Sequence, residues 1–459
     1  MSLTVEPVET IPGLLVLSLP VHGDNRGWFK ENWQRAKMVS LGLPDFGPVQ
    51  QNVSWNATAG AVRGMHAEPW DKLVSVATGS VFGAWVDLRP GSFGRVFTVR
   101  LDPSVAVFVP RGVANGYQVL EDGTAYSYLV NDHWSEAARS AYVFVNLADP
   151  ALGIDWPLPF GEMSDADRAH PPLSSVSPVS LPGTVVLGSS GQVGSALREV
   201  LPSATFWDRS AVDLSVPSSV TSADWSSYSM IVNAAAYTAV DLAETPSGRR
   251  EAWATNVAGV GALVEAARAR RATLVHVSSD YVFDGSVEEH DEDEPFSPLG
   301  VYGQTKAAGD ALVGSLPAHY LLRASWVVGS GKNFVATMAS LADSGASPSV
   351  VDDQIGRLTF AADIARAMTH LVSSAAPFGT YNVSCSGPSA SWADIAALVF
   401  ELRGRSGSDV RRVSTSTYYA SADGPIAPRP SYSTLSLDKI AATGFEPRDW
   451  REALEAHLA

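Results

Sequence analysis

Three residues with basic or proton-transferring side chains precede a stretch that alternates like a β-strand. Arg63, His66 and Lys72 lie in the segment AVRGMHAEPWDKLVSVATGSVF, which spans residues 61–82. Histidine exchanges a proton near neutral pH, and a neighbouring ammonium group stabilises the anion that forms when a proton is removed. The spacing therefore indicates a pocket in which His66 takes a proton and Lys72 holds the resulting charge. Surface residues on a connecting loop would give the same pattern.

A second reactive pair lies far along the chain, in VYGQTKAAGD. Tyr302 and Lys306 are four residues apart at a predicted helix start, so they share one helical face. An ammonium beside a phenol favours the phenolate and lowers its pKa from about 10, so the tyrosine can protonate a carbonyl oxygen as a hydride reaches the carbon. Ser279 ends a buried strand, where ligands bind in an open α/β sheet, and its hydroxyl is positioned to fix that carbonyl. A structural pair is the alternative.

A glycine-rich turn precedes this pair. Gly188, Gly191 and Gly194 form GxxGxxG between a predicted strand and a predicted helix, which is typical of a dinucleotide pyrophosphate site at a helix N-terminus. About twenty residues on, Asp208 and Arg209 follow a possible second strand. Aspartate would bind the ribose hydroxyls of NADH and arginine the 2′-phosphate of NADPH, so both cofactors stay open.

The elements that carry these residues fall into two halves. Short alternating stretches up to about residue 156, separated by Gly, Pro, Asp and Asn, predict a sandwich, jelly roll or barrel. From residue 184 strands alternate with helices, which predicts a Rossmann-type, doubly wound parallel sheet. Between them lies a segment rich in Pro and Ser that is typical of a linker. We expect a first domain at 1–172, a linker at 173–183 and a second domain at 184–459.

Composition narrows the possible functions. The 459 residues carry a net charge of −16, which argues against a nucleic-acid surface. The single cysteine, Cys385, excludes an intramolecular disulfide framework. No leader-like N-terminus and no run of about 18 apolar residues appears. We therefore expect a cytoplasmic protein that does not enter a membrane.

The segments VNAAAYTAVDLAE, HVSSDYVFDG, VYGQTKAAGD, LLRASWVVG, VVDDQIG and APRPSYSTL follow the glycine turn in this order. From Thr184 to the C-terminus the chain resembles an extended short-chain dehydrogenase, and more narrowly the dTDP-4-dehydrorhamnose reductases. The resemblance implies that the catalytic residues are Ser279, Tyr302 and Lys306. It implies that the cofactor is lined by Gly191, Gln192, Val193, Asp213, Leu214, Ala234, Ala235 and Ala236, and the substrate by Asp280, Trp326 and Arg429. The family has threonine at Ser279, and the unusual DQIGRLT and RPSYS leave the sugar pocket open.

In the first half, GDNRGWFKENW, PVQQNVSWN, RGMH, TAYSYLVND and GEMSDADRAHPPL occur in order. From Val5 to Leu173 the chain resembles the dTDP-4-dehydrorhamnose 3,5-epimerases, which are cupin-type jelly rolls. The resemblance makes His66 the base that Asp167 orients, sets Lys72 and Arg63 against the developing oxyanion, and makes Tyr128 the acid on the opposite face. It assigns the pyrophosphate to Arg26 and the nucleoside to Glu31, Gln50 and Asn52.

Two positions depart from the epimerase pattern. Asn115 replaces a histidine that contacts phosphate, so it bears on substrate binding, and Trp134 replaces a tyrosine of the base or sugar wall. His66 has no HxH partner of the kind that holds a metal in many cupins, so we expect no metal.

Together the two resemblances predict a fusion of consecutive steps toward dTDP-L-rhamnose, with NADPH or NADH as the reductant. Another deoxysugar product, such as a 6-deoxy-talose, and a UDP-linked substrate remain open. So does a chain in which one half is inactive and serves in binding or regulation. By analogy with the epimerases we expect a homodimer formed through the first domain.

Overall fold

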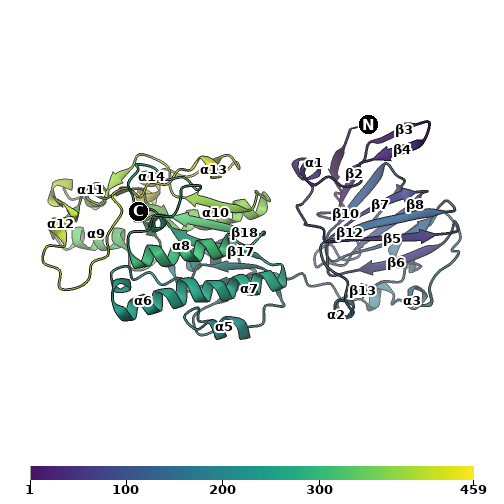
Figure 1. Cartoon of the computed structure of the whole chain (residues 1–459), viewed down its shortest axis with the longest axis horizontal. Coiled ribbons are helices and arrows are strands. Elements are labelled where there is room, and N and C mark those ends of the chain that lie inside the picture. Colours follow the sequence, from purple (N-terminus) through teal and green to yellow (C-terminus); the bar gives the residue numbers. More distant parts are fainter. Residues whose placement is uncertain (1) are drawn as a thin grey trace. The chain divides into compact units, whose positions relative to one another are not determined.

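The chain divides into two compact units, a first unit of Met1–Leu181 and a second unit of Pro182–Ala459 (Figure 1). The structure, a computed structural model, describes residues 2–459. Within the segment predicted as a linker, Leu173, Val176 and Val179 pack against the core of the first unit. Across residues 2–459, no helix combines the length and the apolar character needed to cross a membrane.

The first unit is a sandwich of two antiparallel sheets. The larger sheet has the order β1 (Thr4–Pro7), β2 (Leu15–Ser18), β10 (Val105–Val109), β7 (Lys72–Thr78), β12 (Thr124–Val130), β5 (Gln50–Asn56). The smaller sheet has the order β13 (Val143–Phe144), β6 (Val62–Ala67), β11 (Val113–Val119), β8 (Val81–Asp87), β9 (Val96–Leu101). Val74 and Val107 from the larger sheet pack with Trp85 and Tyr117 from the smaller one. The predicted all-β first domain is confirmed.

Short elements border the sandwich. They are the hairpin β3 (Val21–Asp24) and β4 (Gly27–Lys30), the helices α1 (Arg35–Ser40), α2 (Glu136–Arg139) and α3 (Asp165–Arg168), and the 3₁₀ turns η1 (Pro150–Leu152) and η2 (Leu173–Ser175). Figure 1 shows the hairpin at the end of the unit opposite to α3 and β13. The stretch at residues 141–147 forms the short strand β13, which pairs with β6, and backbone hydrogen bonds between Val145 and Met65 of β6 continue this pairing.

The second unit is built on a six-stranded parallel sheet with helices on both faces, as predicted. The strand order is β15 (Thr205–Trp207), β14 (Gly183–Leu187), β16 (Tyr228–Asn233), β17 (Thr273–Ser279), β18 (His319–Ala324), β23 (Gly379–Val383). One face packs on α4 (Gln192–Val200) and α10 (Ala361–Ser373). The other packs on α5 (Pro217–Ser222), α7 (Val260–Arg270) and α8 (Val301–Val313). Successive strand residues supply opposite faces, as Val185 and Val186 do.

The helical segment before β17 is interrupted. It consists of α6 (Pro246–Trp253), a π-helical turn η4 (Ala254–Gly259) and then α7. Gly259 lies so close to Leu214 that a Cβ there would meet the Leu214 carbonyl oxygen at 2.1 Å. The 3₁₀ turns η3 (Leu242–Glu244) and η5 (Asp280–Val282) follow β16 and β17.

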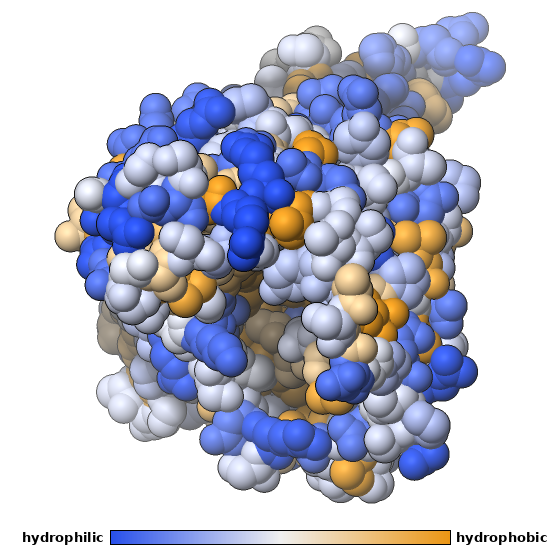
Figure 2. All heavy atoms as spheres, turned by 90° about the vertical axis from the view of Figure 1, so that its left-hand side faces the viewer, coloured by the Kyte–Doolittle hydropathy of each residue, from blue (hydrophilic) through white to orange (hydrophobic). Residues whose placement is uncertain are grey.

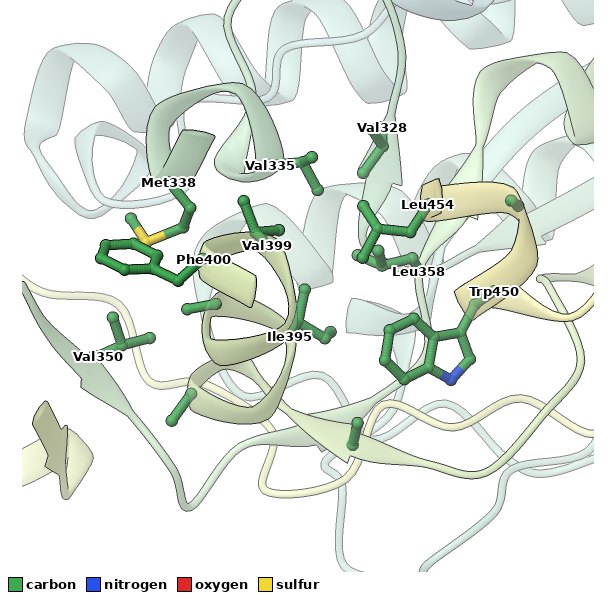
Figure 3. Packing of buried hydrophobic residues seen from close by; sticks show 14 of the residues in the cluster. Val328, Val335, Met338, Val350, Leu358, Ile395, Val399, Phe400, Trp450 and Leu454 are labelled. Carbon is green, nitrogen blue, oxygen red and sulfur yellow. The ribbon is translucent and has the colours of Figure 1, made fainter. Parts of the chain in front are cut away.

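The C-terminal part of the second unit forms a further hydrophobic core, in which α9 (Phe334–Asp343), α11 (Trp392–Leu402) and α14 (Trp450–Leu458) meet (Figure 3). Cys385 is buried in this core, and burial raises the pKa of its thiol to about 12. The smaller elements here are β19 (Val327–Val328), β20 (Ser349–Val351), β21 (Ile355–Gly356), β22 (Thr359–Phe360), β24 (Ala390–Ser391), η6 (Gly407–Asp409), β25 (Arg411–Val413), α12 (Thr415–Tyr418), α13 (Asp438–Ala441). Figure 2 shows a hollow with a largely hydrophilic rim on the face of this unit.

A buried ion pair fixes α8 against β18. Arg323 Nε donates to Asp310 Oδ2 at 3.2 Å, and the Arg323 guanidinium also donates to the Glu292 carbonyl oxygen at 2.9 Å. Ser278 Oγ donates to the other oxygen of Asp310 at 2.5 Å. Both charged side chains are almost fully buried, so neither can be solvated if its partner is removed.

Replacing Arg323 by leucine should therefore lower the free energy of unfolding by about 3–5 kcal/mol, because the Asp310 carboxylate is left buried and unpaired. Urea denaturation of the full chain, followed by tryptophan fluorescence, measures this loss. Arg403→Leu is the matched control, since Arg403 pairs with Asp343 at the exposed surface, and we expect no measurable change for it. Equal midpoints for the two variants would contradict the importance of the buried pair.

Candidate active sites

His66 and Asp167 form a hydrogen-bonded pair in the first unit. His66 lies on β6, and Asp167 lies on α3, whose first turn is capped by Ser164. His66 Nε2 is 2.9 Å from Asp167 Oδ1. Burial would raise the pKa of Asp167, but hydrogen bonds from His66 and Ser164 hold that pKa below its usual range. With Nε2–H donated to a carboxylate, Nδ1 carries the lone pair that a general base needs, and the imidazolium formed is stabilised.

Lys72 lies at the start of β7, beside this pair. Its Nζ donates to Asn115 Oδ1 at 2.6 Å and forms an ion pair with Glu68 Oε2 at 2.6 Å. Asn115 is the cross-strand partner of His66, and its Nδ2 donates to the Tyr126 hydroxyl at 3.3 Å. At the position where the resemblance places histidine, Asn115 thus accepts a hydrogen bond from the buried lysine.

Glu68 was not predicted from the sequence. It follows His66 by two residues, so strand alternation puts both on one face, and this spacing is the signal that could have revealed it. His66, Glu68, Lys72, Asn115 and Tyr128 line a cavity of about 130 Å³ together with Arg63, Ser54, Gly64, Val74, Tyr117 and Tyr126. Burial raises the pKa of Tyr128 to about 12, which keeps its phenol protonated.

A larger pocket of about 820 Å³ opens beside this cavity and shares Arg63 and His66 with it. Aromatic side chains make up much of its wall: Trp55, Trp134, Tyr142 and Phe144. Gln50 on β5 borders it, because Gln50 Oε1 accepts the backbone N–H of Trp134 and Gln50 Nε2 donates to Asn52. Aromatic walls with a few polar groups fit a nucleoside and a sugar.

Arg26 and Glu31 lie apart from these residues. Arg26 is at the tip of the β3–β4 hairpin and pairs with Asp24. Glu31 pairs with Lys37 and lines a separate cavity of about 310 Å³. Within a single chain, therefore, Arg26 and Glu31, the two residues predicted to bind the nucleotide, do not lie in the pocket of His66.

His170 is a further neighbour of the pair that the sequence did not reveal. Its Nε2 is 3.7 Å from Asp167 Oδ1, and its ring stacks on Phe144 with centroids 4.6 Å apart. His66, Asp167 and His170 each offer a ligand atom within 4.8 Å of the others. A metal ion held there would replace the hydrogen bond between His66 and Asp167, so we keep the prediction of no metal.

In the second unit the glycine turn joins β14 to α4. Gly188 has φ +76°, and a Cβ on Gly188 would meet the Ala235 backbone nitrogen at 2.7 Å. A Cβ on Gly194 would meet the Gly188 carbonyl oxygen at 2.2 Å. The turn after β14 therefore packs against Ala234–Ala236 after β16, where the strand order reverses and open α/β sheets bind their ligands.

The α4 N-terminus completes a cradle for a dinucleotide. Gly191 is the N-cap of α4, and Gln192 and Val193 are its first residues. The Gln192 side-chain oxygen is buried without a hydrogen-bond partner. A helix N-terminus with closely approaching backbone fits a pyrophosphate.

The predicted selectors of the cofactor are exposed. Asp208 follows β15 and accepts hydrogen bonds from Ser210, which lower the pKa of its carboxyl. Arg209 Nε donates to Asp213 Oδ2 at 3.0 Å, and Leu214 is buried beside η4. Neither Asp208 nor Arg209 is committed to a ribose or phosphate position, so the choice between NADH and NADPH stays open.

Tyr302 and Lys306 lie on α8 as predicted, and Ser279 ends β17. Burial raises the pKa of Tyr302, although a hydrogen bond with Ser279 opposes the shift. The sequence predicted that Lys306 lowers the pKa of Tyr302, and the structure does not show this lowering. Lys306 Nζ instead donates to the Val277 carbonyl oxygen at 2.9 Å, and burial lowers the pKa of Lys306 to about 8.

The residues predicted to lie on the sugar side differ in their relation to Tyr302. Asp280 accepts from Ser279 Oγ at 2.9 Å, its other oxygen is buried without a partner, and burial raises its pKa to about 6. Arg429 pairs with Asp241 and interacts electrostatically with Tyr281, whose ring meets Tyr302 edge to face. Trp326 stacks on Trp392 with ring centroids 3.8 Å apart.

Comparisons with known proteins match the two units separately. The family model for dTDP-4-dehydrorhamnose 3,5-epimerase matches residues 9–175, and the model for the RmlD substrate binding domain matches residues 183–459. A protein RmlC homolog of Streptococcus pyogenes serotype M6 is 53% identical over 184 residues, which cover 39% of this chain and 93% of that protein. The chain belongs to both families.

Relatives of the second unit (Pro182–Ala459), called the RmlD unit from here on, support the same assignment. The dTDP-4-dehydrorhamnose reductase of Aggregatibacter actinomycetemcomitans is 36% identical over 288 residues, which cover 59% of this chain and 96% of that protein. The crystal structure of the Bacillus anthracis reductase in complex with NADP is 33% identical with a TM-score of 0.55, and the match covers 60% of this chain and 98% of that one. The predicted fusion of an epimerase with a reductase is confirmed at the level of family.

The glycine turn gives a prediction for the RmlD unit. Gly194→Ala should lower the thermal midpoint and abolish NADPH binding, because the new Cβ cannot fit beside the Gly188 carbonyl. Gly191→Ala should keep the midpoint, since its Cβ would be 3.4 Å from that oxygen, and any loss would be confined to cofactor affinity. Differential scanning fluorimetry and NADPH fluorescence measure the two effects. Tight NADPH binding by Gly194→Ala would contradict the proposed cradle.

Proposed function

We propose that the chain is a bifunctional enzyme of dTDP-L-rhamnose synthesis. The first unit (Met1–Leu181), called the epimerase unit from here on, would invert C3 and C5 of dTDP-4-dehydro-6-deoxy-D-glucose. The RmlD unit would reduce the C4 ketone of the product. The observation that carries the proposal is the presence, in one chain, of a His66–Asp167 pair facing a buried lysine and of a Tyr302–Lys306 pair beside a dinucleotide cradle.

The epimerase chemistry follows from the acidity of protons next to a ketone. His66 would remove the proton at C3 or C5 through Nδ1, and Asp167 would stabilise the imidazolium. The enolate oxygen would face Lys72 and Arg63, which line the same cavity. Because burial keeps Tyr128 protonated, its phenol is a suitable donor to the opposite face of the carbon.

Glu68 adjusts the charge of this cavity. Its carboxylate forms an ion pair with Lys72. The pair keeps a buried ammonium from standing alone, while the hydrogen bond to Asn115 fixes the position of Nζ. The lysine thus presents a hydrogen-bond donor rather than an isolated charge to the substrate oxygen.

The reductase chemistry requires a proton donor beside a hydride donor. The bound nicotinamide, NADPH or NADH, would supply the hydride to C4. Ser279 and Tyr302 would hold the C4 oxygen, and the Tyr302 phenol would give it a proton. The solved B. anthracis relative is described with NADP, which supports a nicotinamide dinucleotide as the cofactor of this unit.

A cytoplasmic location follows from this proposal, because nucleotide sugars and reduced nicotinamide cofactors are cytoplasmic metabolites. The sugar nucleotide would occupy the 820 Å³ pocket with its base among the aromatic residues. Neither the nucleotide base nor the configuration at C4 is fixed by these contacts. Experiment therefore decides whether the substrate is linked to UDP and whether the product is a 6-deoxy-talose.

Separating the two activities tests the proposal. In D₂O without cofactor, the wild type should exchange the C3 and C5 protons of the substrate, and His66→Ala should slow this exchange by about 10²–10⁴-fold. With NADPH, the wild type should form dTDP-L-rhamnose, whereas Tyr302→Phe should exchange protons normally and oxidise no NADPH. NMR of the sugar and absorbance of NADPH provide the readouts.

Exposed His133→Ala is the matched control for the first variant and should behave as wild type. Normal exchange by His66→Ala would refute the epimerase assignment. Normal NADPH oxidation by Tyr302→Phe would refute the reductase assignment. A talose product would agree with both sites. It would show that the configuration at C4, which the sugar pocket of the RmlD unit sets, was assigned wrongly.

We also propose that the chain forms a homodimer through the epimerase unit. The hairpin exposes Trp28 and Phe29, and the outer face of edge strand β5 exposes Val53 and Trp55. An exposed edge strand and apolar side chains favour association. If Arg26 and Glu31 bind the nucleotide, as the resemblance implies, they would reach the pocket of a second copy.

Mixing two inactive variants tests this dimer. Arg26→Ala and His66→Ala chains, unfolded and refolded together, should recover up to about one quarter of the wild-type exchange rate if each site combines residues from two copies. Sedimentation velocity should show a dimer of the wild type. A monomer, or no recovery with a dimer present, would refute the shared site.

A further inference from the structure

The Lys306 amino group lies on a buried polar chain that the predicted catalytic residues do not include. His276 Nε2 on β17 is 3.4 Å from Lys306 Nζ, and His276 Nδ1 is 3.0 Å from Asn233 Nδ2 on β16. All three side chains are at most 2% exposed. Buried polar groups next to a reactive lysine influence which protonation state it adopts.

The orientation of Asn233 determines which nitrogen of His276 carries a proton. Asn233 Oδ1 accepts the backbone N–H of Ala235 at 3.1 Å, so its NH₂ group faces the imidazole. An amide NH₂ donates and cannot accept, and His276 Nδ1 must therefore accept. Burial lowers the pKa of His276 well below its usual value. The ring is thus neutral, with its proton on Nε2.

The Nε2–H group of His276 is directed at Lys306. An ammonium has three donors and no lone pair, so it would oppose this N–H, whereas a neutral amine accepts it. We propose that Asn233 and His276 are positioning residues that hold an N–H donor against Lys306 and thereby favour its neutral amine form. The consequence for catalysis rests on the role of Lys306 in the proposed reductase.

Other groups around Lys306 also influence its protonation state. Asp310, one turn further along α8, favours the ammonium, but its carboxylate is shared with Arg323 on β18 and with Ser278. The Val277 carbonyl on β17 accepts from Nζ. Burial outweighs Asp310, and the pKa of Lys306 is lowered to about 8. His276 adds a directional preference to this effect of burial.

A lysine poised in this way can return a proton to Tyr302. After the phenol protonates the sugar oxygen, the phenolate is left in a site that raises its pKa. The proton then moves from the Lys306 ammonium to the phenolate: one N–H bond breaks, one O–H bond forms, and a neutral amine remains. His276 Nε2–H stabilises that amine until solvent reprotonates it.

The tautomer of His276 is directly observable. Histidine-selective ¹⁵N labelling and NMR of the full chain should show a protonated Nε2 and an unprotonated Nδ1 between about pH 6 and about pH 9. A protonated Nδ1 would overturn the proposal. This readout needs no substrate, so it stands even if the reductase activity is not found.

The pH dependence of NADPH-driven reduction tests the effect on Lys306. The wild-type rate should fall as the pH rises past about 8, because the ammonium is lost above its pKa. His276→Gln can turn its Oε1 to the Asn233 amide and keep an N–H donor toward Lys306, so its profile should stay near that of the wild type. His276→Leu removes the N–H donor, so its decline should move to higher pH. The ratio of kcat at about pH 9 to kcat at about pH 7 should rise roughly threefold or more.

His319→Leu is the matched control, because His319 is a buried histidine of β18 whose ring binds the Leu316 carbonyl oxygen. Its pH profile should equal that of the wild type. An unchanged profile of folded His276→Leu would overturn the proposal. If His276→Leu does not fold, the tautomer measured in the wild type decides it.

Discussion

The burial of ionisable side chains is the constraint on which both units depend. Removing a charge from water costs several kcal/mol unless a partner or a hydrogen bond offsets it. In the epimerase unit Lys72 meets this cost through Glu68 and Asn115. In the RmlD unit Asp310 meets it through Arg323 and Ser278, while Lys306 has only uncharged partners within hydrogen-bonding distance among the described residues. The difference suits the roles proposed for them, in which Lys72 stabilises an oxyanion as an ammonium and Lys306 releases a proton.

Sheet geometry supplies this pairing in each unit by a different route. In the sandwich, antiparallel register sets His66 directly opposite Asn115, and Asn115 in turn reaches Lys72 on the facing sheet. In the parallel sheet, β14, β16 and β17 end at one edge, so the glycine turn, Ala234–Ala236 and Ser279 follow three strands to the same side. The reactive groups are therefore positioned by strand ends and register rather than by long loops.

Much of this was predictable from local sequence patterns. The glycine turn, the strand that ends at Ser279 and the helix that carries Tyr302 are each specified by a few adjacent residues, and the structure has all three. Asn233 and His276 were not recognised because a polar residue in a buried strand gives no periodic signal. Their partnership depends on parallel pairing between strands forty residues apart.

The protonation behaviour of the site residues was harder to predict from the sequence than the identity of those residues. Tyr302 and Lys306 share a helical face, yet burial dominates both, and the phenol pKa moves opposite to the expected direction. Motif order likewise identified Arg26 without showing that the hairpin holds it away from His66. Spacing along a chain specifies which groups are present, and solvent exclusion and distance in space decide what they do.

The buried thiol of Cys385 has a practical consequence. A thiol with a pKa near 12, enclosed in an apolar core, supplies little thiolate at neutral pH, so maleimides and mild oxidants should leave it unmodified. A cysteine introduced at an exposed position of either unit would then react selectively. The native chain thus serves as its own unreactive background for fluorescent or spin labels placed on either unit.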